Sequence, residues 1–370
     1  MTAPFEHFYS VIPAGGIGSR LWPLSRADAP KFLHDLAGTG QTLLRDTWDR
    51  LVPLSGAQRI MVVTGRAHRA AVEEQLPELA DPNVVLESEP KDSSAAIGLA
   101  AAILHQREPD VVIGSFAADH VIRDARSFRR AVAEGIAAAN AGYIATIGIT
   151  PTEPAVGFGY IECGPPMMIA DAPHSVAATA FVEKPNLATA ERYIADGQHL
   201  WNAGMFIARA DVLLEELGRS QPELLAGIAE LAQAWDTHRR GAVVDRVWPR
   251  LTKIAIDYSV AEPAAAAGRL VVIPGDFGWD DVGDFASIAK LHSGGRKSDL
   301  AIIGENARVL ADASTGVVVS QSGRLISLIG VTDIVIVDTP DALLVTTTAN
   351  AQRVKSVVDA LKISGRDDVL

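Results

Sequence analysis

The stretch VIPAGGIGSRLWPLSR, residues 11–26, joins an apolar run to a loop with three glycines and decides how the first half of the chain folds. The apolar run predicts a strand, and glycines directly after it let the main chain approach a ligand closely. Main-chain N–H groups in such a loop bind anions, and Arg20 and Lys31 would add charge-assisted hydrogen bonds to phosphate. The predicted phosphate-binding residues are Ala14, Gly15, Gly16, Gly18, Ser19, Arg20 and Lys31.

The glycine spacing excludes two common phosphate loops. A dinucleotide-binding loop of the form G-x-G-x-x-G that began at Gly16 would need a third glycine where Leu21 stands. A Walker loop needs Gly-Lys-Ser/Thr, and residues 18–20 read GSR instead. The loop therefore holds phosphate in another way.

Strand-like and helix-like runs alternate after the loop. Such alternation predicts an α/β fold, Rossmann-like, with a mostly parallel sheet and helices on both faces. The predicted strands are 59–64, 83–87, 110–116 and 143–149, and the predicted helices are 67–76, 92–104 and 125–139.

The pattern changes after residue 291. Residues 292–299, HSGGRKSD, are polar and glycine-rich and predict a linker. Short β-rich runs separated by turn residues then predict a small β domain with coil-like repeats, closed by a helix over 350–361. The β-rich runs are 307–310, 316–320, 325–329, 334–338 and 343–347.

Composition excludes several classes of protein. The 370 residues carry a formal charge of 33 − 45 = −12, which argues against nucleic-acid binding because that needs a basic face. Cys163 is the single cysteine, so no disulfide framework or cysteine-based zinc site is expected. No signal peptide or membrane-length apolar stretch stands out. We expect a cytoplasmic protein that does not contact membranes.

Two acidic positions are candidates for metal binding. Asp119 follows the apolar run 110–116, and in open α/β sheets ligands bind at the carboxyl ends of strands. Residues 278–284, GWDDVGD, offer Asp280 or Asp281. Mg²⁺ takes one or two protein carboxylates and completes its shell with water and phosphate, so Asp119 and one of this pair would suffice.

The string AGGIGSRLWPLSR, with PKF at 30–32, resembles the signature of bacterial mannose-1-phosphate guanylyltransferases, a branch of the sugar-nucleotide pyrophosphorylases. The resemblance implies that the glycines wrap a nucleotide while Arg20 and Lys31 neutralise its triphosphate. Residues 279–283, WDDVG, are similar to the family's WSDVG, which selects Asp281. The catalytic set would then be Arg20, Lys31, Asp119 and Asp281, with Mg²⁺ on Asp119 and Asp281.

The sugar side is implied by three segments of the same resemblance. These are GFGY at 157–160, FVEKP at 181–185 and WNAGMF at 201–206. They imply that Gly159, Glu183, Lys184 and Asn202 contact the sugar phosphate. Residues 256–260, IDYSV, also match a family segment, to which we assign no role.

One segment departs from the family pattern. Residues 91–97 read KDSSAAI where the family has RNTAPAI. Lys91 and Ser93 are the corresponding predicted nucleotide contacts. Lys91 keeps the positive charge but lacks the bidentate geometry of a guanidinium, so the choice of base is open.

The implied activity is transfer of GMP from GTP to mannose 1-phosphate, giving GDP-mannose and pyrophosphate. Residues 1–291 would form the catalytic domain, and residues 299–370 a β domain like a left-handed β-helix. The resemblance reaches residues 338–345, DTPDALLV, and the chain lacks the extra isomerase domain of some relatives, which implies a single activity.

Several alternatives stay open. The chain could be a pyrophosphorylase for another sugar or base, or a non-catalytic relative that binds sugar nucleotides. The second alternative fits poorly, because such relatives usually lose the loop arginine or a metal-binding aspartate. A glycosyltransferase would need a D-x-D motif, which residues 119–121, DHV, do not provide. A homodimer through the β domain is a further open prediction.

Overall fold

A mixed sheet forms the centre of the protein in the computed structural model, which describes residues 5–293, 299–304 and 307–370. Its nine strands lie in the order β3-β2-β1-β4-β9-β6-β10-β8-β7. The strands β3, β2, β1 and β4 run parallel, as do β6 and β10. In contrast, β9 runs antiparallel to both β4 and β6, and β8 runs antiparallel to β10 and β7.

The strands of this sheet are β1 (Phe8–Ala14), β2 (Ile60–Gly65), β3 (Val84–Glu87), β4 (Val112–Ser115), β6 (Ile144–Ile149), β7 (Tyr160–Pro166), β8 (Val176–Val182), β9 (His199–Arg209) and β10 (Leu270–Gly275). A separate short pair joins β5 (Val121–Ile122) to β11 (Trp279–Asp280). The helices of this part are α1 (Leu43–Ser55), α2 (Arg69–Gln75), α3 (Ser93–Arg107), α4 (Ala125–Asn140), α5 (Leu187–Asp196), α6 (Ala210–Ser220), α7 (Pro222–Trp235), α8 (Arg240–Val247), α9 (Glu262–Ala266) and α10 (Phe285–Ser293).

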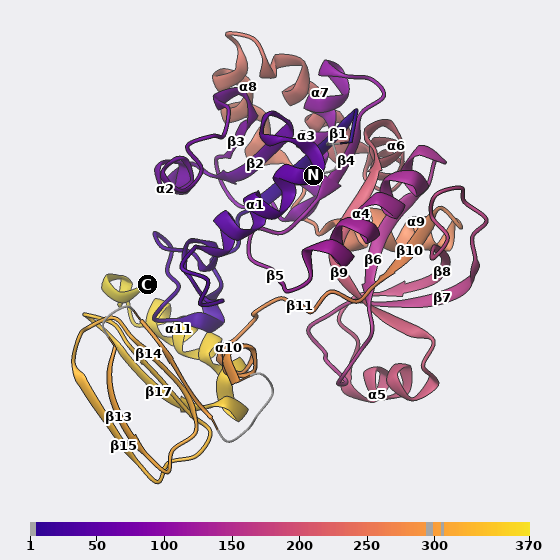
Figure 1. Ribbon diagram of the computed structural model, residues 1–370. Coiled ribbons are helices and arrows are strands. Elements are labelled where there is room, and N and C mark those ends of the chain that lie inside the picture. The colour runs from indigo at the N-terminus through magenta and orange to yellow at the C-terminus, as the bar shows by residue number, and fades with distance from the viewer. Residues whose placement is uncertain (1–4, 294–298, 305–306) are drawn as a thin grey trace.

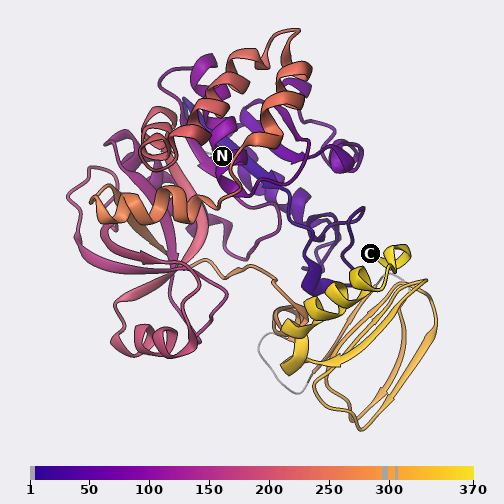
Figure 2. The ribbon, with the colours of Figure 1, turned by 180° about the vertical axis from the view of Figure 1, so that it is seen from behind.

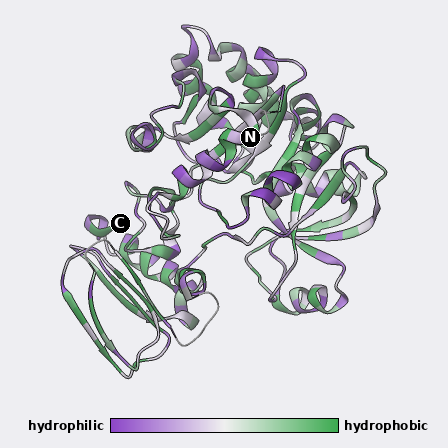
Figure 3. Ribbon diagram, viewed as in Figure 1, coloured by the Kyte–Doolittle hydropathy of each residue, from purple (hydrophilic) through white to green (hydrophobic). Residues whose placement is uncertain are grey.

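Each face of the sheet has its own apolar core. Successive strand residues point to opposite faces, so Val11 packs with α3, α6 and α7, whereas Ile12 packs with α1 and α4. Figure 1 shows helices on both sides of the strands, and Figure 3 shows that the central strands are mainly hydrophobic. This arrangement confirms the predicted α/β class with helices on both faces.

The sheet is mixed where the sequence predicted a mostly parallel one. The reason is β9, which inserts antiparallel between β4 and β6 and pairs at its other end with β7. The predicted parallel pattern therefore holds for β3, β2, β1 and β4, whereas in the second half of the sheet only β6 and β10 pair in parallel. The same insertion places Asn202 of β9 beside Gly148 of β6.

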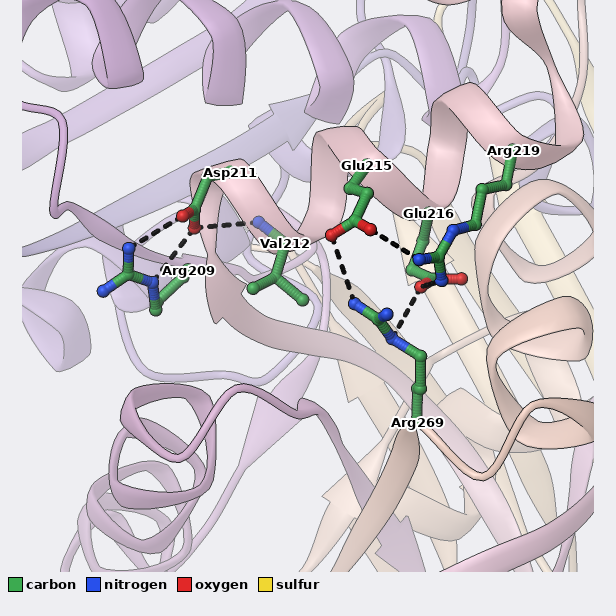
Figure 4. Close-up of polar contacts among 7 residues, drawn as sticks. All are labelled: Arg209, Asp211, Val212, Glu215, Glu216, Arg219 and Arg269. Atoms are coloured by element: carbon green, nitrogen blue, oxygen red, sulfur yellow. Dashed lines mark hydrogen bonds and ion pairs between the residues drawn. The ribbon is translucent and has the colours of Figure 1, made fainter.

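Charged side chains fasten α6 to the start of β10 (Figure 4). Glu216 is almost fully buried and accepts from Arg219, at 2.6 Å, and from Arg269, at 2.7 Å. Arg269 also lies 3.4 Å from Glu215. Because a buried carboxylate is tolerated only when it is paired, these contacts fix the amino end of β10. The carboxyl end of β10 then leads to β11.

The C-terminal part forms a coil of short strands. These strands are β12 (Leu300–Ile303), β13 (Arg308–Asp312), β14 (Gly316–Ser320), β15 (Leu325–Ile329), β16 (Ile334–Asp338) and β17 (Leu343–Thr347), followed by α11 (Val354–Ile363). Strand β12 pairs in parallel with β14, and β14 with β16, while β13 pairs in parallel with β15. The predicted C-terminal β domain closed by a helix is thereby confirmed. Its left-handed sense and the boundaries 1–291 and 299–370 stay predictions.

Most of the predicted linker 292–299 lies outside the described residues. The β domain nevertheless contacts the first part of the chain directly. Leu21, Trp22 and Leu24 share one apolar core with residues of β14, β16 and α11. Figure 1 and Figure 2, seen from opposite sides, both show the indigo loop after β1 reaching the yellow helix α11. Within the described residues, no helix is both long and apolar enough to cross a membrane.

Replacing Gly316 by Ala tests the packing of the coil. Gly316 has φ of +125°, and a Cβ built there would lie 2.0 Å from the main-chain oxygen of Ile334. Since β14 and β16 are paired at this point, Gly316→Ala should lower the free energy of unfolding by about 2–4 kcal/mol. Denaturant unfolding measures this change.

Gly323→Ala is the matched control. Gly323 also has positive φ, +74°, but a Cβ there meets nothing within 4 Å. It should cost only about 1–2 kcal/mol, from the left-handed backbone. Equal unfolding midpoints for the two variants would contradict the expected backbone clash.

Candidate active site

The glycine loop after β1 folds back over Lys31. Gly18 adopts φ of +78°, and a Cβ built there would lie 2.7 Å from the Cβ of Lys31. The main-chain N–H of Lys31 donates to the carbonyl of Ile17 at 3.1 Å. A residue with a side chain at position 18 would therefore push Lys31 away. The loop glycine and the lysine form one local unit.

Lys31 links this loop to two aspartates from distant parts of the chain. Its side chain is buried, and its Nζ lies 2.9 Å from Oδ2 of Asp119, which follows β4. The same Nζ donates to the main-chain oxygen of Asp281, which follows β11. Burial alone would raise the pKa of the Asp119 carboxyl, but the charge and hydrogen bond of Lys31 outweigh burial and hold that pKa below its ordinary value.

Arg20 and the Asp281 carboxylate both lie close to Gly283. A Cβ built on Gly283 would lie 3.0 Å from Oδ2 of Asp281 and 3.5 Å from Nη1 of Arg20. Burial raises the pKa of Asp281 to about 6, although Lys31 opposes the shift. Asp280 plays a different part, because its Oδ1 accepts the N–H of Val282 at 2.7 Å and so shapes the turn. The structure thus brings together Arg20, Lys31, Asp119 and Asp281.

The predicted sugar contacts form a second group. A Cβ built on Gly159 would lie 2.6 Å from Oε2 of Glu183, and Lys184 donates to Oε1 of that same carboxylate. The main-chain N–H of Asn202 donates to the carbonyl of Gly159 at 2.8 Å. Its side-chain oxygen accepts from Thr146 at 2.8 Å, which sets the direction of the amide. All four predicted residues therefore lie in one place.

Asp257 joins this second group, and the sequence assigned it no role. Its Oδ1 accepts from Nδ2 of Asn202 at 2.9 Å. Burial, and then the nearby Glu183 carboxylate, raises the pKa of Asp257 to about 7. Asp257 begins a π-helical turn, Asp257–Ala261, a rare form that is frequent at functional sites. The acidic residue inside the matching segment IDYSV was the signal that could have found it.

A row of aromatic rings connects the two groups. Phe158 precedes Gly159, and its ring lies 5.2 Å from that of Trp279, centroid to centroid. Trp279 in turn packs edge-on against His120 at 5.4 Å and donates to its Nδ1 at 3.3 Å. Burial lowers the pKa of His120 to about 4, so this ring is neutral at pH 7. His120 follows Asp119 of the first group and Phe158 precedes Gly159 of the second, so the row spans both groups.

Two predicted nucleotide contacts are engaged elsewhere. Nζ of Lys91 donates to the carbonyl of Pro249 at 2.6 Å and lies 2.8 Å from Glu89. The Ser93 hydroxyl accepts the N–H of Ile256 at 2.9 Å. The structure does not bring these two side chains to Arg20 and Lys31, and their role in nucleotide binding stays a prediction.

Glu87 is a further acidic residue at the glycine loop that the sequence did not single out. It ends β3, and its Oε2 lies 3.4 Å from a Cβ built on Gly15. Burial, and then the charge on Asp92, raises the pKa of Glu87 to about 7. Its position at the carboxyl edge of the parallel strands could have identified it.

The carboxylates of Asp119 and Asp281 match the hard oxygen donors that Mg²⁺ prefers. Among the described residues, no three His, Cys, Asp or Glu side chains cluster as a closed metal cage. An open pair of carboxylates fits a divalent ion whose remaining ligands are water and phosphate.

Comparison with known proteins places the whole chain among sugar-phosphate enzymes. Residues 9–297 match the nucleotidyl transferase family, and residues 307–361 match the MannoseP isomerase/GMP-like beta-helix domain. The chain is similar to the xanthan biosynthesis protein XanB of Xanthomonas campestris pv. campestris strain B100, with 37% identity over 97% of this chain and 74% of the relative. It is 36% identical to the mannose-1-phosphate guanylyltransferase of Escherichia coli K12, with the same coverage.

A solved structure agrees with these sequence relatives. The crystal structure of mannose-1-phosphate geranyltransferase from Thermus thermophilus superposes with a TM-score of 0.85 at 31% identity. The match covers 96% of this chain and 99% of that one, so it includes the C-terminal β domain.

Asp257→Asn should flatten the dependence of stability on pH. Between the ordinary pKa of an aspartate, 3.8, and about 7, the folded protein keeps a proton on Asp257 that the unfolded chain releases. The free energy of unfolding therefore falls as the pH rises across this interval. Asparagine cannot ionise, so the variant should gain about 1–3 kcal/mol relative to the unmodified protein between pH 5 and pH 8. Chemical denaturation at several pH values measures this difference.

Asp211→Asn provides the control for that measurement. Arg209 lowers the pKa of Asp211, so this group is ionised in both the folded and the unfolded chain above pH 5. Its effect on stability should be constant from pH 5 to pH 8. If Asp257→Asn also changes the free energy of unfolding by the same amount at every pH from 5 to 8, Asp257 does not hold a proton in the folded state.

Proposed function

The chain belongs to the nucleotidyl transferase family and, within it, to the mannose-1-phosphate guanylyltransferases, and we propose that it makes GDP-mannose from GTP and mannose 1-phosphate. The observation that carries this proposal is the meeting of Arg20, Lys31, Asp119 and Asp281 beside the glycine loop. Two cations and two carboxylates at a phosphate-binding loop suit a reaction between two phosphate anions.

The reaction forms one bond and breaks one. A phosphate oxygen of mannose 1-phosphate attacks the α-phosphorus of GTP in line with the bond to the β-phosphate. That bond breaks, and its electron pair leaves with pyrophosphate. No general base is needed, because the attacking phosphate oxygen is already an anion. The protein therefore contributes by positioning the substrates and by stabilising charge.

Asp119 and Asp281 are the residues that would hold Mg²⁺. The ion, when bound, supplies positive charge that lets the two substrate phosphates approach each other. Lys31 is held beside both aspartates, so its ammonium group would lie close to the same phosphates once they are bound. Arg20, next to the Asp281 carboxylate, would neutralise charge that develops on the departing pyrophosphate.

The second group is suited to a sugar phosphate. Lys184 carries the cation that would hold the 1-phosphate, while Glu183 and Asp257 would accept hydrogen bonds from sugar hydroxyl groups. Asn202 has its oxygen engaged by Thr146 and one N–H engaged by Asp257, so it holds Asp257 in place. The cytoplasmic location and the homodimer stay predictions.

A pyrophosphate-release assay tests the substrates. GTP, ATP and dTTP are each combined with mannose 1-phosphate and glucose 1-phosphate, in the presence of Mg²⁺. We expect kcat/KM to be highest for GTP with mannose 1-phosphate, by about tenfold or more over each other pair, which corresponds to about 1.4 kcal/mol of discrimination. Faster turnover with another base or sugar would assign the chain to a different pyrophosphorylase, and turnover with none would indicate a non-catalytic relative.

Asp119→Asn tests whether the Asp119 carboxylate takes part in catalysis. The substitution removes the carboxylate that pairs with Lys31 and would bind the divalent ion, so kcat should fall about a hundredfold or more. Initial rates over a range of Mg²⁺ concentrations measure the loss.

Asp124→Asn is the control for this substitution. Asp124 caps α4 by accepting the N–H groups of Arg126 and Ser127, and asparagine caps helices equally well. Its activity should stay within twofold of the unmodified enzyme. Normal Mg²⁺-dependent turnover by Asp119→Asn would refute the metal assignment.

A further inference from the structure

Arg26 reaches from the glycine-loop segment to the C-terminal β domain. Its Nη1 lies 2.7 Å from Oδ2 of Asp341, and its Nη2 lies 2.6 Å from Oδ1 of the same carboxylate. Nη2 also donates to the Thr339 hydroxyl at 3.3 Å. We call these three residues the Arg26 clamp. A bidentate pair of this kind fixes the direction of the guanidinium plane as well as its distance.

Apolar packing holds the same segment from its other side. Leu21, Trp22 and Leu24 are buried in the core of the β domain, and Nε1 of Trp22 donates to the carbonyl of Val369 at 2.7 Å. These three signature residues therefore pack against the C-terminal β domain. Apolar contact is not directional, so this packing alone does not set the register of the loop.

Hydrogen bonds within residues 17–31 connect Arg26 to Lys31. The N–H of Arg26 donates to the carbonyl of Ala29 at 2.9 Å and closes a turn. The Ser25 hydroxyl donates to the carbonyl of Ile17, which also accepts the N–H of Lys31. A displacement of Arg26 would therefore move Ser25, Ile17 and the Lys31 main chain together.

We propose that Asp341, together with Thr339, is a positioning residue for nucleotide transfer, because by holding Arg26 it keeps residues 17–31 in the conformation that binds the triphosphate. This inference rests on the proposed function. It gives the C-terminal β domain a part in catalysis, although Asp341 itself touches neither the glycines nor Lys31 in the described contacts. The Arg26 guanidinium also lowers the pKa of the Asp341 carboxyl, so the pair stays charged at neutral pH.

A purely structural role predicts a different result. The Asp341 side chain is 48% exposed, but the Arg26 side chain is only 14% exposed, so loss of the carboxylate leaves a largely buried guanidinium without its partner. A purely structural role would therefore lower the thermal unfolding temperature and leave the KM for both substrates unchanged. If the pair positions the loop, its loss should weaken GTP binding and leave mannose 1-phosphate binding unaffected.

Asp341→Asn and Asp341→Ala test this difference in the full-length enzyme. We expect KM for GTP to rise about five- to tenfold in both variants, while KM for mannose 1-phosphate stays within twofold. Arg26→Ala should raise KM for GTP by a similar factor. The double variant Arg26→Ala/Asp341→Ala should be no worse than either single variant, because the two residues act through one contact. Asp341→Asn keeps the shape of the side chain and so covers the case in which Asp341→Ala fails to fold.

Asp236→Ala is the matched control. Asp236 receives a bidentate pair from Arg107 at 2.9 and 2.8 Å, joins separate helices and is 57% exposed, but lies away from the glycine loop. It should leave KM for both substrates within twofold. An unchanged KM for GTP in the folded Asp341 variants would overturn the proposal. An equal rise of the KM for GTP in Asp236→Ala would also overturn it, as would a double variant whose KM for GTP rises by the product of the two single-variant factors.

Hydrogen exchange separates failure of the clamp from failure of the proposed function. In the absence of substrates, Asp341→Asn should increase exchange of main-chain amides in residues 17–31, and Asp236→Ala should not. An unmodified enzyme that lacks activity with every substrate pair would refute the proposed function, whatever the exchange data show. An active enzyme with unchanged exchange and unchanged KM in Asp341→Asn would refute the clamp alone.

Discussion

The buried ammonium group of Lys31 is the contact on which the site depends. A charge taken out of water is tolerated only with partners, and Lys31 finds them in the Asp119 carboxylate and the Asp281 main-chain oxygen. These partners follow β4 and β11, while Lys31 belongs to the segment after β1. One cation therefore ties three distant parts of the chain together. The lowered pKa of Asp119 shows the same dependence, since Lys31 offsets the burial that would otherwise raise that pKa.

The sequence predicted those parts of the site that carry a local pattern. Arg20, Lys31 and the glycines stand in one short signature, and Asp119 and Asp281 each follow a recognisable run, so their meeting could be expected. Glu87 and Asp257 were missed because each is a single acidic residue whose importance lies in its burial, which only the folded chain reveals. Lys91 and Ser93 sit in an aligned segment, yet contacts with Pro249 and Ile256 turn their side chains elsewhere.

The fold, like the site, has parts that a local sequence pattern predicts and parts that it does not. Strand–helix alternation is a local pattern, and it predicted the parallel strands β1 to β4 correctly. The antiparallel insertion of β9 between β4 and β6 depends on pairing between residues far apart in sequence, for which no local pattern exists. Leu21, Trp22 and Leu24 show a related effect. They resemble a functional signature, but their apolar side chains lie in the core of the β domain.

The two halves of the site differ in how they balance charge, and this difference matches two kinds of substrate group. Beside the glycine loop, two cations face two carboxylates, an arrangement that can accept phosphate and a divalent ion without leaving a charge unpaired. Around Asn202, two carboxylates share the single ammonium of Lys184, so Asp257 can keep a proton near neutral pH. A carboxyl group that is partly protonated can both donate to and accept from a hydroxyl group. Because the aromatic row of Phe158, Trp279 and His120 joins the halves, a molecule with a phosphate at one end and hydroxyl groups at the other fits the pair better than either half alone.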